Sequence, residues 1–135
     1  MRTENMTRNE RILVVDDDIV VRQSLLRVLL QEGHQVDEAC SGAEGVLKLE
    51  NHDYKLVILD LRMPNLGGLT VLQHVRNTRP ETAVLVMTGY PSIENAKESI
   101  QLGALDFLPK PLDATQIRTV VARILAANPL TDERC

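Results

Sequence analysis

KLVILDLRMP, residues 55–64, is a short apolar run that ends in one carboxylate, Asp60. The four aliphatic residues from Leu56 to Leu59 are too few for a typical helix and indicate a strand buried on both faces, as in a parallel sheet. In such sheets, ligands bind beyond the carboxyl ends of the strands, which is where Asp60 would lie. Asp60 is therefore the candidate nucleophile.

Length and composition are those of one globular domain. The chain has 135 residues, of which 44% are hydrophobic and 25% charged, and this is enough to bury a single core. It has only three aromatic residues (Tyr54, Tyr90 and Phe107), so the core must be aliphatic. We expect the folded domain to cover 11–127, with flexible tails at 1–10 and 128–135.

Charge and hydropathy exclude several classes of partner. The net charge of −4 comes without a clustered basic surface, so direct binding to nucleic acid is not expected. No apolar run approaches the roughly 18 residues of a membrane span, and the N-terminus lacks the apolar core of a secretory signal. We expect no membrane association and a cytoplasmic protein. Cys40 and Cys135 lack metal-ligand or redox spacing and are taken as bystander thiols.

The same strand pattern recurs along the chain and alternates with helical periodicity. The expected strands cover 12–15, 34–39, 56–59, 83–87 and 105–108, and a helix follows each of them. Strict alternation predicts parallel strands, right-handed crossovers and helices on both faces of an α/β sheet. Because the second run has only two apolar members, it belongs at an edge, which favours the flavodoxin-like, doubly wound strand order 2-1-3-4-5.

Helix starts and helix faces can also be predicted. Ser41 with Glu44, and Asp113 with Gln116, have the spacing of capping boxes. The helical spacing of the apolar residues predicts which side chains of the second and fourth helices face the sheet. These are Ala43, Val46, Leu47 and Leu49 in the second helix, and Ile93, Ala96 and Ile100 in the fourth.

Polar residues stand where four strands end, and the predicted topology brings them to one edge of the sheet. They are Asp16 and Asp17 after the first strand, Asp60 after the third, Thr88 after the fourth and Lys110 after the fifth. Crowded carboxylates raise one another's pKa unless a hard cation lies among them, and a ligand set made only of oxygen suits Mg²⁺. A lysine and a hydroxyl opposite the metal would complete a cradle for a phosphoryl group, for which a carboxylate is a known nucleophile.

The chain resembles the receiver domain of bacterial two-component response regulators. The resemblance extends over about 11–127 through ILVVDDD, VILDLRMPNLGG, VLVMTGYPS and GALDFLPKP. It implies that Asp60 accepts a phosphoryl group from a sensor histidine kinase, a phosphotransfer protein or a small donor such as acetyl phosphate. It also implies that Asp16, Asp17, Asp60 and the backbone carbonyl of Arg62 hold Mg²⁺. A receiver is not otherwise an enzyme, since it catalyses only its own phosphorylation and dephosphorylation.

The resemblance further implies a switch. Thr88 and Lys110 would contact the phosphoryl oxygens, Phe107 would change rotamer on activation, and the Lys110–Pro111 bond would be cis. We expect Thr88 to move toward phosphorylated Asp60, with Phe107 filling the vacated space. The fourth helix, fifth strand and fifth helix would then form the surface that binds a downstream effector or a second copy in a homodimer. The side chains expected to be exposed there are Asn95, Glu98, Gln101, Arg118 and Thr119.

Three residues need separate comment beside the family's pattern. The family commonly has an acidic residue where this chain has Gly67, so we expect a small loss of stability there, like that of a missing helix cap. The side chain of Arg62 could shield the phosphoryl group or tune its hydrolysis. Asp18 is expected at a helix start and not among the metal ligands.

Other readings stay open at this point. Taken singly, Asp60 is a common turn residue and Lys110 a common surface lysine, and only their meeting at one edge favours a site. The segment Asp16–Val20 also fits the DxDxV motif of haloacid-dehalogenase-type phosphatases, in which Asp16 would be attacked, but that reading leaves Asp60 unexplained. A third possibility is a receiver-like interaction module that is never phosphorylated.

Overall fold

The computed structural model describes residues 11–63 and 65–126. The expected tails at 1–10 and 128–135 lie outside these residues. In the described part, strands and helices alternate along the chain, as their apolar patterns predict. The strands are β1 (Arg11–Val15), β2 (Gln35–Ala39), β3 (Leu56–Asp60), β4 (Ala83–Thr88) and β5 (Asp106–Pro109). The helices are α2 (Ile19–Gln31), α3 (Gly42–Asn51), α4 (Gly68–Thr78), α5 (Ile93–Gln101) and α6 (Ala114–Ala126).

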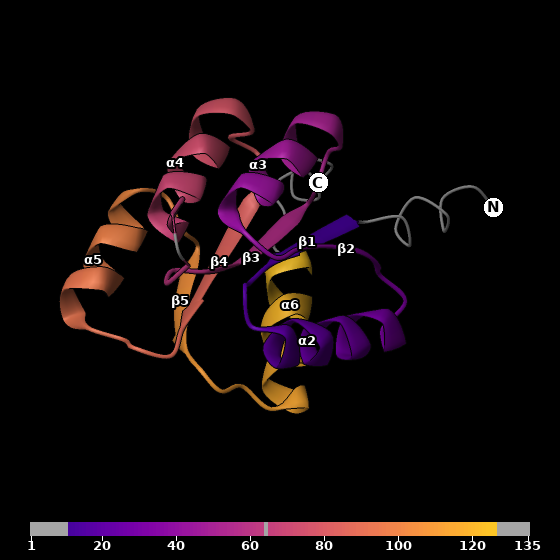
Figure 1. Ribbon diagram of the computed structural model, residues 1–135. Helices are drawn as coiled ribbons and strands as arrows, with labels where there is room; N and C mark the ends of the chain where they lie inside the picture. The colour runs from indigo at the N-terminus through magenta and orange to yellow at the C-terminus, as the bar shows by residue number, and fades with distance from the viewer. Residues whose placement is uncertain (1–10, 64, 127–135) are drawn as a thin grey trace, which may run out of the picture.

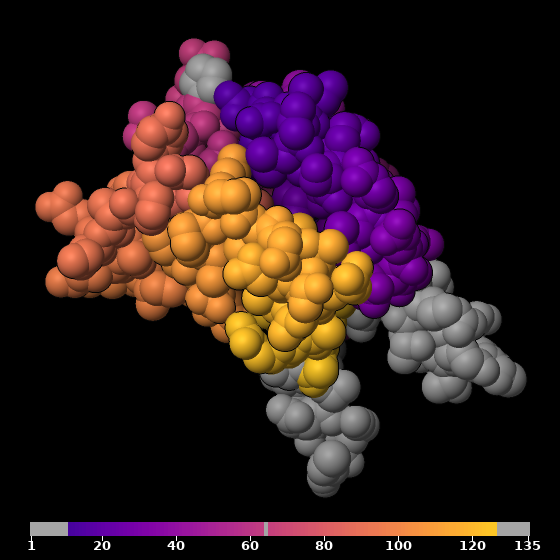
Figure 2. Space-filling model, turned by 90° about the horizontal axis from the view of Figure 1, so that it is seen from below, coloured from indigo at the N-terminus to yellow at the C-terminus, as the bar shows by residue number. Residues whose placement is uncertain are grey.

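The strands form one parallel sheet in the order β2-β1-β3-β4-β5, which confirms the predicted flavodoxin-like topology. Figure 1 shows α2 and α6 below the sheet, α3 and α4 above it, and α5 beside β5. Viewed from below, α2 in indigo and α6 in yellow lie side by side (Figure 2), and these two helices are in contact. The sheet is therefore covered on both faces, as a doubly wound fold requires.

Alternate residues of the central strands pack into two separate cores. On β1, Leu13 and Val15 join the core under α3 and α4, whereas Ile12 and Val14 join the core over α2 and α6. All four side chains are fully buried. Burial of one such side chain stabilises the fold by about 1.5–3 kcal/mol, so the apolar runs are explained by burial on both faces. In β2, by contrast, only Ala39 is fully buried, as expected of an edge strand.

The helix ends follow the predicted signals with one difference. Asp113 and Gln116 form a complete capping box at the start of α6, each side chain accepting from the other's backbone N–H. The Ser41 hydroxyl caps α3 by accepting from the N–H of Glu44 at 3.1 Å. However, the Glu44 carboxylate accepts from the N–H of Cys40 at 2.7 Å and not from that of Ser41. The second half of this capping box is thus shifted by one residue.

The prediction for the inner face of α3 is partly wrong. Val46 is half-buried and Leu49 buried, but Ala43 and Leu47 are exposed. The inner face also carries two buried glycines, Gly42 and Gly45. A Cβ on Gly42 would lie 2.3 Å from the carbonyl oxygen of Leu66, and one on Gly45 would lie 3.1 Å from Val15 Cγ2. The missing side chains allow this face to approach the sheet, and this turns Leu47 outward.

The prediction for α5 is also only partly right: Ala96 is half-buried, as expected, but the two isoleucines are not on the inner face. Ile93 is 80% exposed and Ile100 is 49% exposed, whereas Ser99 is fully buried. The inner stripe of α5 runs through residues with small or polar side chains, and the two isoleucines lie outside it. The half-buried members of that stripe are Asn95, Ala96 and Leu102.

Candidate functional site

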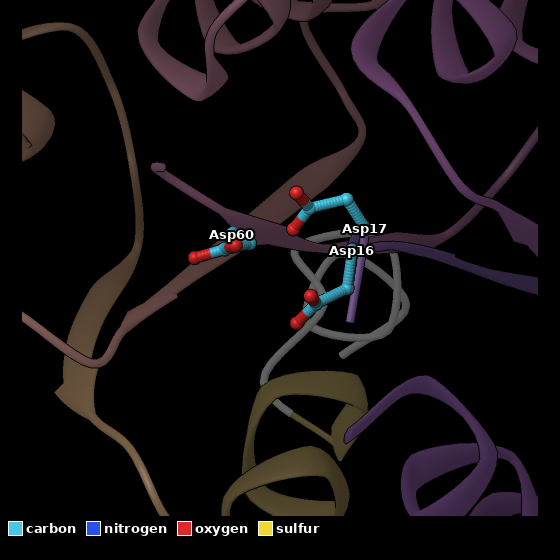
Figure 3. Close-up of side chains that lie close together, drawn as sticks. All are labelled: Asp16, Asp17 and Asp60. Atoms are coloured by element: carbon cyan, nitrogen blue, oxygen red, sulfur yellow. The ribbon is translucent and has the colours of Figure 1, made fainter. Parts of the chain in front are cut away.

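Three carboxylates meet at the carboxyl edge of the sheet. Asp16 follows β1 directly, and Asp60 is the last residue of β3, the strand that pairs with β1. Asp16 and Asp60 are 1% and 4% exposed, while Asp17 is exposed. One carboxylate oxygen of each lies within 4.8 Å of those of the other two (Figure 3). The predicted meeting of these residues is what the structure shows.

Lys110 brings an ammonium group to the same carboxylates. It follows β5, where its N–H donates to the Thr88 carbonyl at 2.8 Å, and the Lys110–Pro111 peptide is cis. Its Nζ lies 2.9 Å from Asp16 Oδ2 and 3.5 Å from Asp60 Oδ1. Burial lowers the pKa of Lys110, but the hydrogen bond and charge of Asp16 and the charge of Asp60 outweigh burial and leave this pKa above its ordinary value. The side chain is therefore a permanent cation near neutral pH.

Asp60 is in an environment that opposes its negative charge. Burial is the main cause that raises its pKa above the ordinary value, and the charge of Asp16 is the second. The ammonium of Lys110 and the N–H of Arg62, at 3.4 Å from Asp60 Oδ1, offset only part of this rise. Negative charge therefore remains in excess at this edge, although Lys110 is close.

The residues present fit a hard divalent cation. The grouped ligand atoms are all carboxylate oxygens, which Mg²⁺ prefers, and two of the three carboxylates are buried. A cation among them would relieve the repulsion between Asp16 and Asp60 that raises the pKa of Asp60. This is the donor set expected of a Mg²⁺ site.

Thr88 and Phe107 lie on neighbouring strands at different depths. Thr88 ends β4, one residue beyond Met87, which pairs with Asp60. Its side chain is fully buried, and Oγ1 accepts from the N–H of Tyr90 at 3.1 Å. Phe107 lies on β5, pairs with Val86 of β4 and is half-buried against the core under α3 and α4. Thr88 is thus at the edge with the carboxylates, whereas Phe107 lies level with Val86, two residues further back along β4.

Asp18 has a structural role, as predicted. Its carboxylate caps α2 by accepting from the N–H groups of Val20 at 2.9 Å and Val21 at 3.3 Å. Its own N–H donates to Asp16 Oδ1 at 2.9 Å. Asp18 is therefore committed to the helix start and is absent from the group of potential metal ligands.

Gly68 supports the site in a way that its sequence position alone did not reveal. A Cβ on Gly68 would lie 2.4 Å from the carbonyl oxygen of Asp60 and 2.7 Å from the Cα of Leu61. The start of α4 can approach the backbone of Asp60 only because Gly68 has no side chain. The Gly67–Gly68 pair was the available signal, but it predicted only a turn. Gly67 is the N-cap of α4 without a side-chain hydrogen bond, in line with the expected missing cap.

Arg62 contacts an aromatic ring at the rim of the site. Its guanidinium carbon lies 4.6 Å from the centre of the Tyr90 ring, and both side chains are exposed. Each follows a site residue by two positions, Arg62 after Asp60 and Tyr90 after Thr88. This cation–π pair spans the loops after β3 and β4.

The comparison with known protein families agrees with this geometry. The model of the response regulator receiver domain matches residues 12–122. The chain belongs to the response regulator receiver family. Receiver domains are phosphorylation-dependent signalling switches, so the class of function expected from the sequence is confirmed. The haloacid-dehalogenase reading is wrong, because the match covers the whole arrangement of strands and includes Asp60 and its loop.

Similar proteins include longer regulators. The acid tolerance regulatory protein ActR of Rhizobium meliloti (strain 1021) is 38% identical over 109 residues, which are 81% of this chain and 56% of ActR. The transcriptional regulatory protein ZraR of Escherichia coli (strain K12) is 37% identical over 118 residues, 87% of this chain and 27% of ZraR. This receiver domain thus spans about half the length of ActR and about a quarter of ZraR.

Solved structures of other receivers share the fold. A CheY-like receiver domain protein from Methanospirillum hungatei JF-1 has a TM-score of 0.87 at 30% identity, with 91% of this chain and 98% of that chain covered. NtrX from Brucella abortus, in complex with ADP, has a TM-score of 0.85 at 31% identity, with 93% of this chain and 29% of the NtrX chain covered. Within the described residues, no helix has the length and apolar character needed to cross a bilayer.

Proposed function

We propose that this receiver domain is a switch in which Asp60 accepts a phosphoryl group from a sensor histidine kinase, a phosphotransfer protein or acetyl phosphate. The observation that carries the proposal is the meeting of Asp60 with Asp16, Asp17 and Lys110 at one edge of the sheet. Its place of action is the cytoplasm, as the resemblance to response regulators implies.

In the transfer step, a carboxylate oxygen of Asp60 attacks the phosphorus atom and forms a P–O bond. The P–N bond of a phosphohistidine breaks and leaves the donor imidazole, or the P–O bond of acetyl phosphate breaks and releases acetate. Lys110 and the Thr88 hydroxyl contact the phosphoryl oxygens. Asp16, Asp17, Asp60 and the Arg62 carbonyl would hold Mg²⁺, which would supply positive charge to neutralise the phosphoryl group. In the dephosphorylation step, water attacks the phosphorus, the bond between the phosphorus and the Asp60 oxygen breaks, and inorganic phosphate is released with the Asp60 carboxylate restored. The domain thus catalyses only its own phosphorylation and dephosphorylation.

The output surface comprises α5, β5 and α6. The motion of Thr88 toward phosphorylated Asp60 would let Phe107 move inward and repack this surface. Glu98, Gln101 and Thr119 are exposed there, whereas Asn95 and Arg118 are half-buried and do not match the expected exposure. Exposed apolar residues on α5 and in the segment before β5 would form a hydrophobic contact with the partner. That partner would be a downstream effector or a second copy of the domain. The exposed apolar residues are Ile93, Ile100 and Leu105.

The experiment is incubation with ³²P-labelled acetyl phosphate and Mg²⁺, followed by mapping of the labelled residue. We expect one label, on Asp60, that Asp60→Asn abolishes and Asp18→Asn leaves in place, because Asp18 only caps α2. A label on any other residue would contradict the proposed acceptor. No label with acetyl phosphate or with any phosphorylated histidine donor would support an interaction module that is never phosphorylated.

A further inference from the structure

Arg22 lies in the first turn of α2 and is nearly buried for a charged residue, with 11% of its side chain exposed. Such burial is uncommon for arginine unless its donors are satisfied. Its Nη1 donates to the backbone carbonyl of Asp16 at 2.8 Å, and its Nε donates to Glu38 Oε1 at 2.7 Å. Gln23 donates to the same Glu38 oxygen at 3.1 Å. One guanidinium thus joins the acidic loop to the edge strand β2.

These bonds hold the two peptides that flank Asp16, one on each side of the residue. The N–H of Asp16 donates to the carbonyl of Ala39 on β2 at 3.1 Å, while the carbonyl of Asp16 accepts from Arg22. Arg22 is itself fixed by Glu38, which is adjacent to Ala39 on the same strand. The loop is therefore tied to β2 through both backbone groups of one residue.

Asp17 is the residue that depends on this arrangement. Among the described residues its side chain makes no hydrogen bond or ion pair, yet it supplies one of the three grouped carboxylates. Its direction is set by the peptide that precedes it, whose carbonyl Arg22 holds. Figure 3 shows Asp17 directed from the end of β1 toward Asp60.

We propose that Arg22 is a positioning residue for the metal site: with Glu38, it fixes the Asp16–Asp17 peptide so that the Asp17 carboxylate faces Asp60. The inference rests on the proposed function, since it concerns residues that would hold Mg²⁺. Arginine suits this role because its planar fork can donate to a carbonyl and a carboxylate at once, which a lysine ammonium on a flexible stem does less well. Residues that orient metal ligands typically affect metal affinity by about 10–100-fold.

The direction in which replacement of Arg22 changes the Mg²⁺ affinity distinguishes a positioning role from a purely electrostatic one. Removal of a cation next to Asp16 would, by Coulomb attraction alone, strengthen the binding of Mg²⁺. Loss of a positioning bond would weaken it. Arg27 provides a matched control, because it lies on the same helix and is exposed, so Arg27→Gln removes the same charge without touching the acidic loop.

The test is titration of the unphosphorylated protein with Mg²⁺ by calorimetry at 25 °C, with circular dichroism confirming that each variant is folded. We expect Arg22→Gln to weaken Mg²⁺ binding by about tenfold. Arg22→Lys, which keeps the charge, should have a Mg²⁺ affinity between those of Arg22→Gln and the wild type. If Arg22→Gln does not fold, the affinity of Arg22→Lys is compared with that of the wild type instead. In the metal-free protein, the amide NMR shifts of Asp17 and Asp18 should change in Arg22→Gln and stay unchanged in Arg27→Gln.

If both Arg22 variants bind Mg²⁺ as tightly as the wild type or more tightly, the proposed positioning role of Arg22 is overturned. If the wild type binds Mg²⁺ and Asp17→Asn abolishes binding, such a result leaves the proposed metal site intact. Failure of the wild type to bind Mg²⁺ at millimolar concentration would overturn both proposals.

Discussion

Asp60 is the residue at which the folded state most clearly disfavours a negative charge. Burial and the charge of Asp16 raise its pKa above the unfolded value, so the native state binds this proton more tightly than the unfolded chain does. The charged form then costs stability, and this cost grows as the pH rises from the unfolded pKa of about 3.9 through the folded pKa. The apo domain is strained by the same charge that would attract a metal.

Asp60→Asn should therefore raise the melting temperature of the metal-free domain at pH 7. Each kcal/mol gained corresponds to roughly 4 °C in a domain of this size. The gain should vanish as the pH falls below about 4, where wild-type Asp60 is protonated. Thermal unfolding in EDTA between pH 3.5 and 8 measures this difference. Asp53→Asn is the control, because its side chain is 89% exposed, and a gain for Asp60→Asn that is the same at pH 4 and pH 7 would contradict the charge as the cause.

The Arg62–Tyr90 pair addresses the open question of the Arg62 side chain. An exposed cation–π contact is worth about 0.5–1 kcal/mol, which corresponds to a rate factor of roughly two to five. If the pair covers phosphorylated Asp60, then Arg62→Ala and Tyr90→Ala should each accelerate loss of the phosphoryl group by this factor. The double variant should be no faster than the faster single one. The lifetime of ³²P-labelled protein in the presence of Mg²⁺ checks this, and unchanged or longer lifetimes would rule out shielding.

Among the elements, α5 differs most from its sequence pattern. Its inner face carries Ser99, whose fully buried hydroxyl has no hydrogen-bond partner among the described residues. Its outer face carries Ile93 and Ile100. A helix with a small, polar inner face and an apolar outer face contributes little to the core and offers apolar surface for binding.

Two serine-to-alanine substitutions in α5 should therefore have opposite signs. Ser99→Ala removes a buried hydroxyl without a partner and should raise the free energy of unfolding by about 1 kcal/mol. Ser92→Ala removes the N-cap, which accepts from the N–H of Asn95 at 3.0 Å, and should lower it by about 0.5–2 kcal/mol. Urea denaturation of both variants measures the difference, and a destabilised Ser99→Ala would mean that the hydroxyl has a partner in solution.

In the whole molecule, the switch must carry a signal from the carboxyl edge of the sheet to α5, β5 and α6. Moving a domain from 1:99 to 99:1 between two states takes about 5.5 kcal/mol. Hydrogen bonds to charged groups contribute about 1.5–3 kcal/mol each, so new bonds from Thr88, Lys110 and a backbone amide are sufficient. Thr88 must give up its bond to the N–H of Tyr90 if its hydroxyl turns to the phosphoryl group.

Thr88→Ala should keep phosphorylation at Asp60 but uncouple it from the distant surface. The NMR shift differences between the phosphorylated and unphosphorylated forms should shrink at Ile100, Leu105 and Thr119, while those near Asp60 persist. Thr78→Ala is the matched control, since Thr78 is exposed on α4 and, among the residues described, its hydroxyl donates only to the carbonyl of His74 in the same helix. Differences at the distant surface as large as in the wild type would show that Thr88 does not carry the signal.

What the sequence by itself determined is the part of the fold that depends on local pattern. Short apolar runs, capping residues and strict alternation were enough to predict a five-stranded parallel sheet and the position of Asp60 at a strand end, because burial on both faces leaves few other arrangements. Strand order then brought Asp16 and Lys110 to Asp60, although they are 44 and 50 residues away along the chain.

Only the tertiary structure decided how each helix is rotated and which long side chains tie the loops together. The outward turn of Leu47 follows from the close approach of the other face of α3 to Val15 and Leu66, which lie far from it in the sequence. In α5, Ile93 is exposed although its apolar spacing predicted a buried position. The bonds from Arg22 to Asp16 and Glu38 depend on the register of β1 with β2, in which Val14 pairs with Glu38. Local periodicity carries no information about such contacts, because they form only when separate segments are packed against one another.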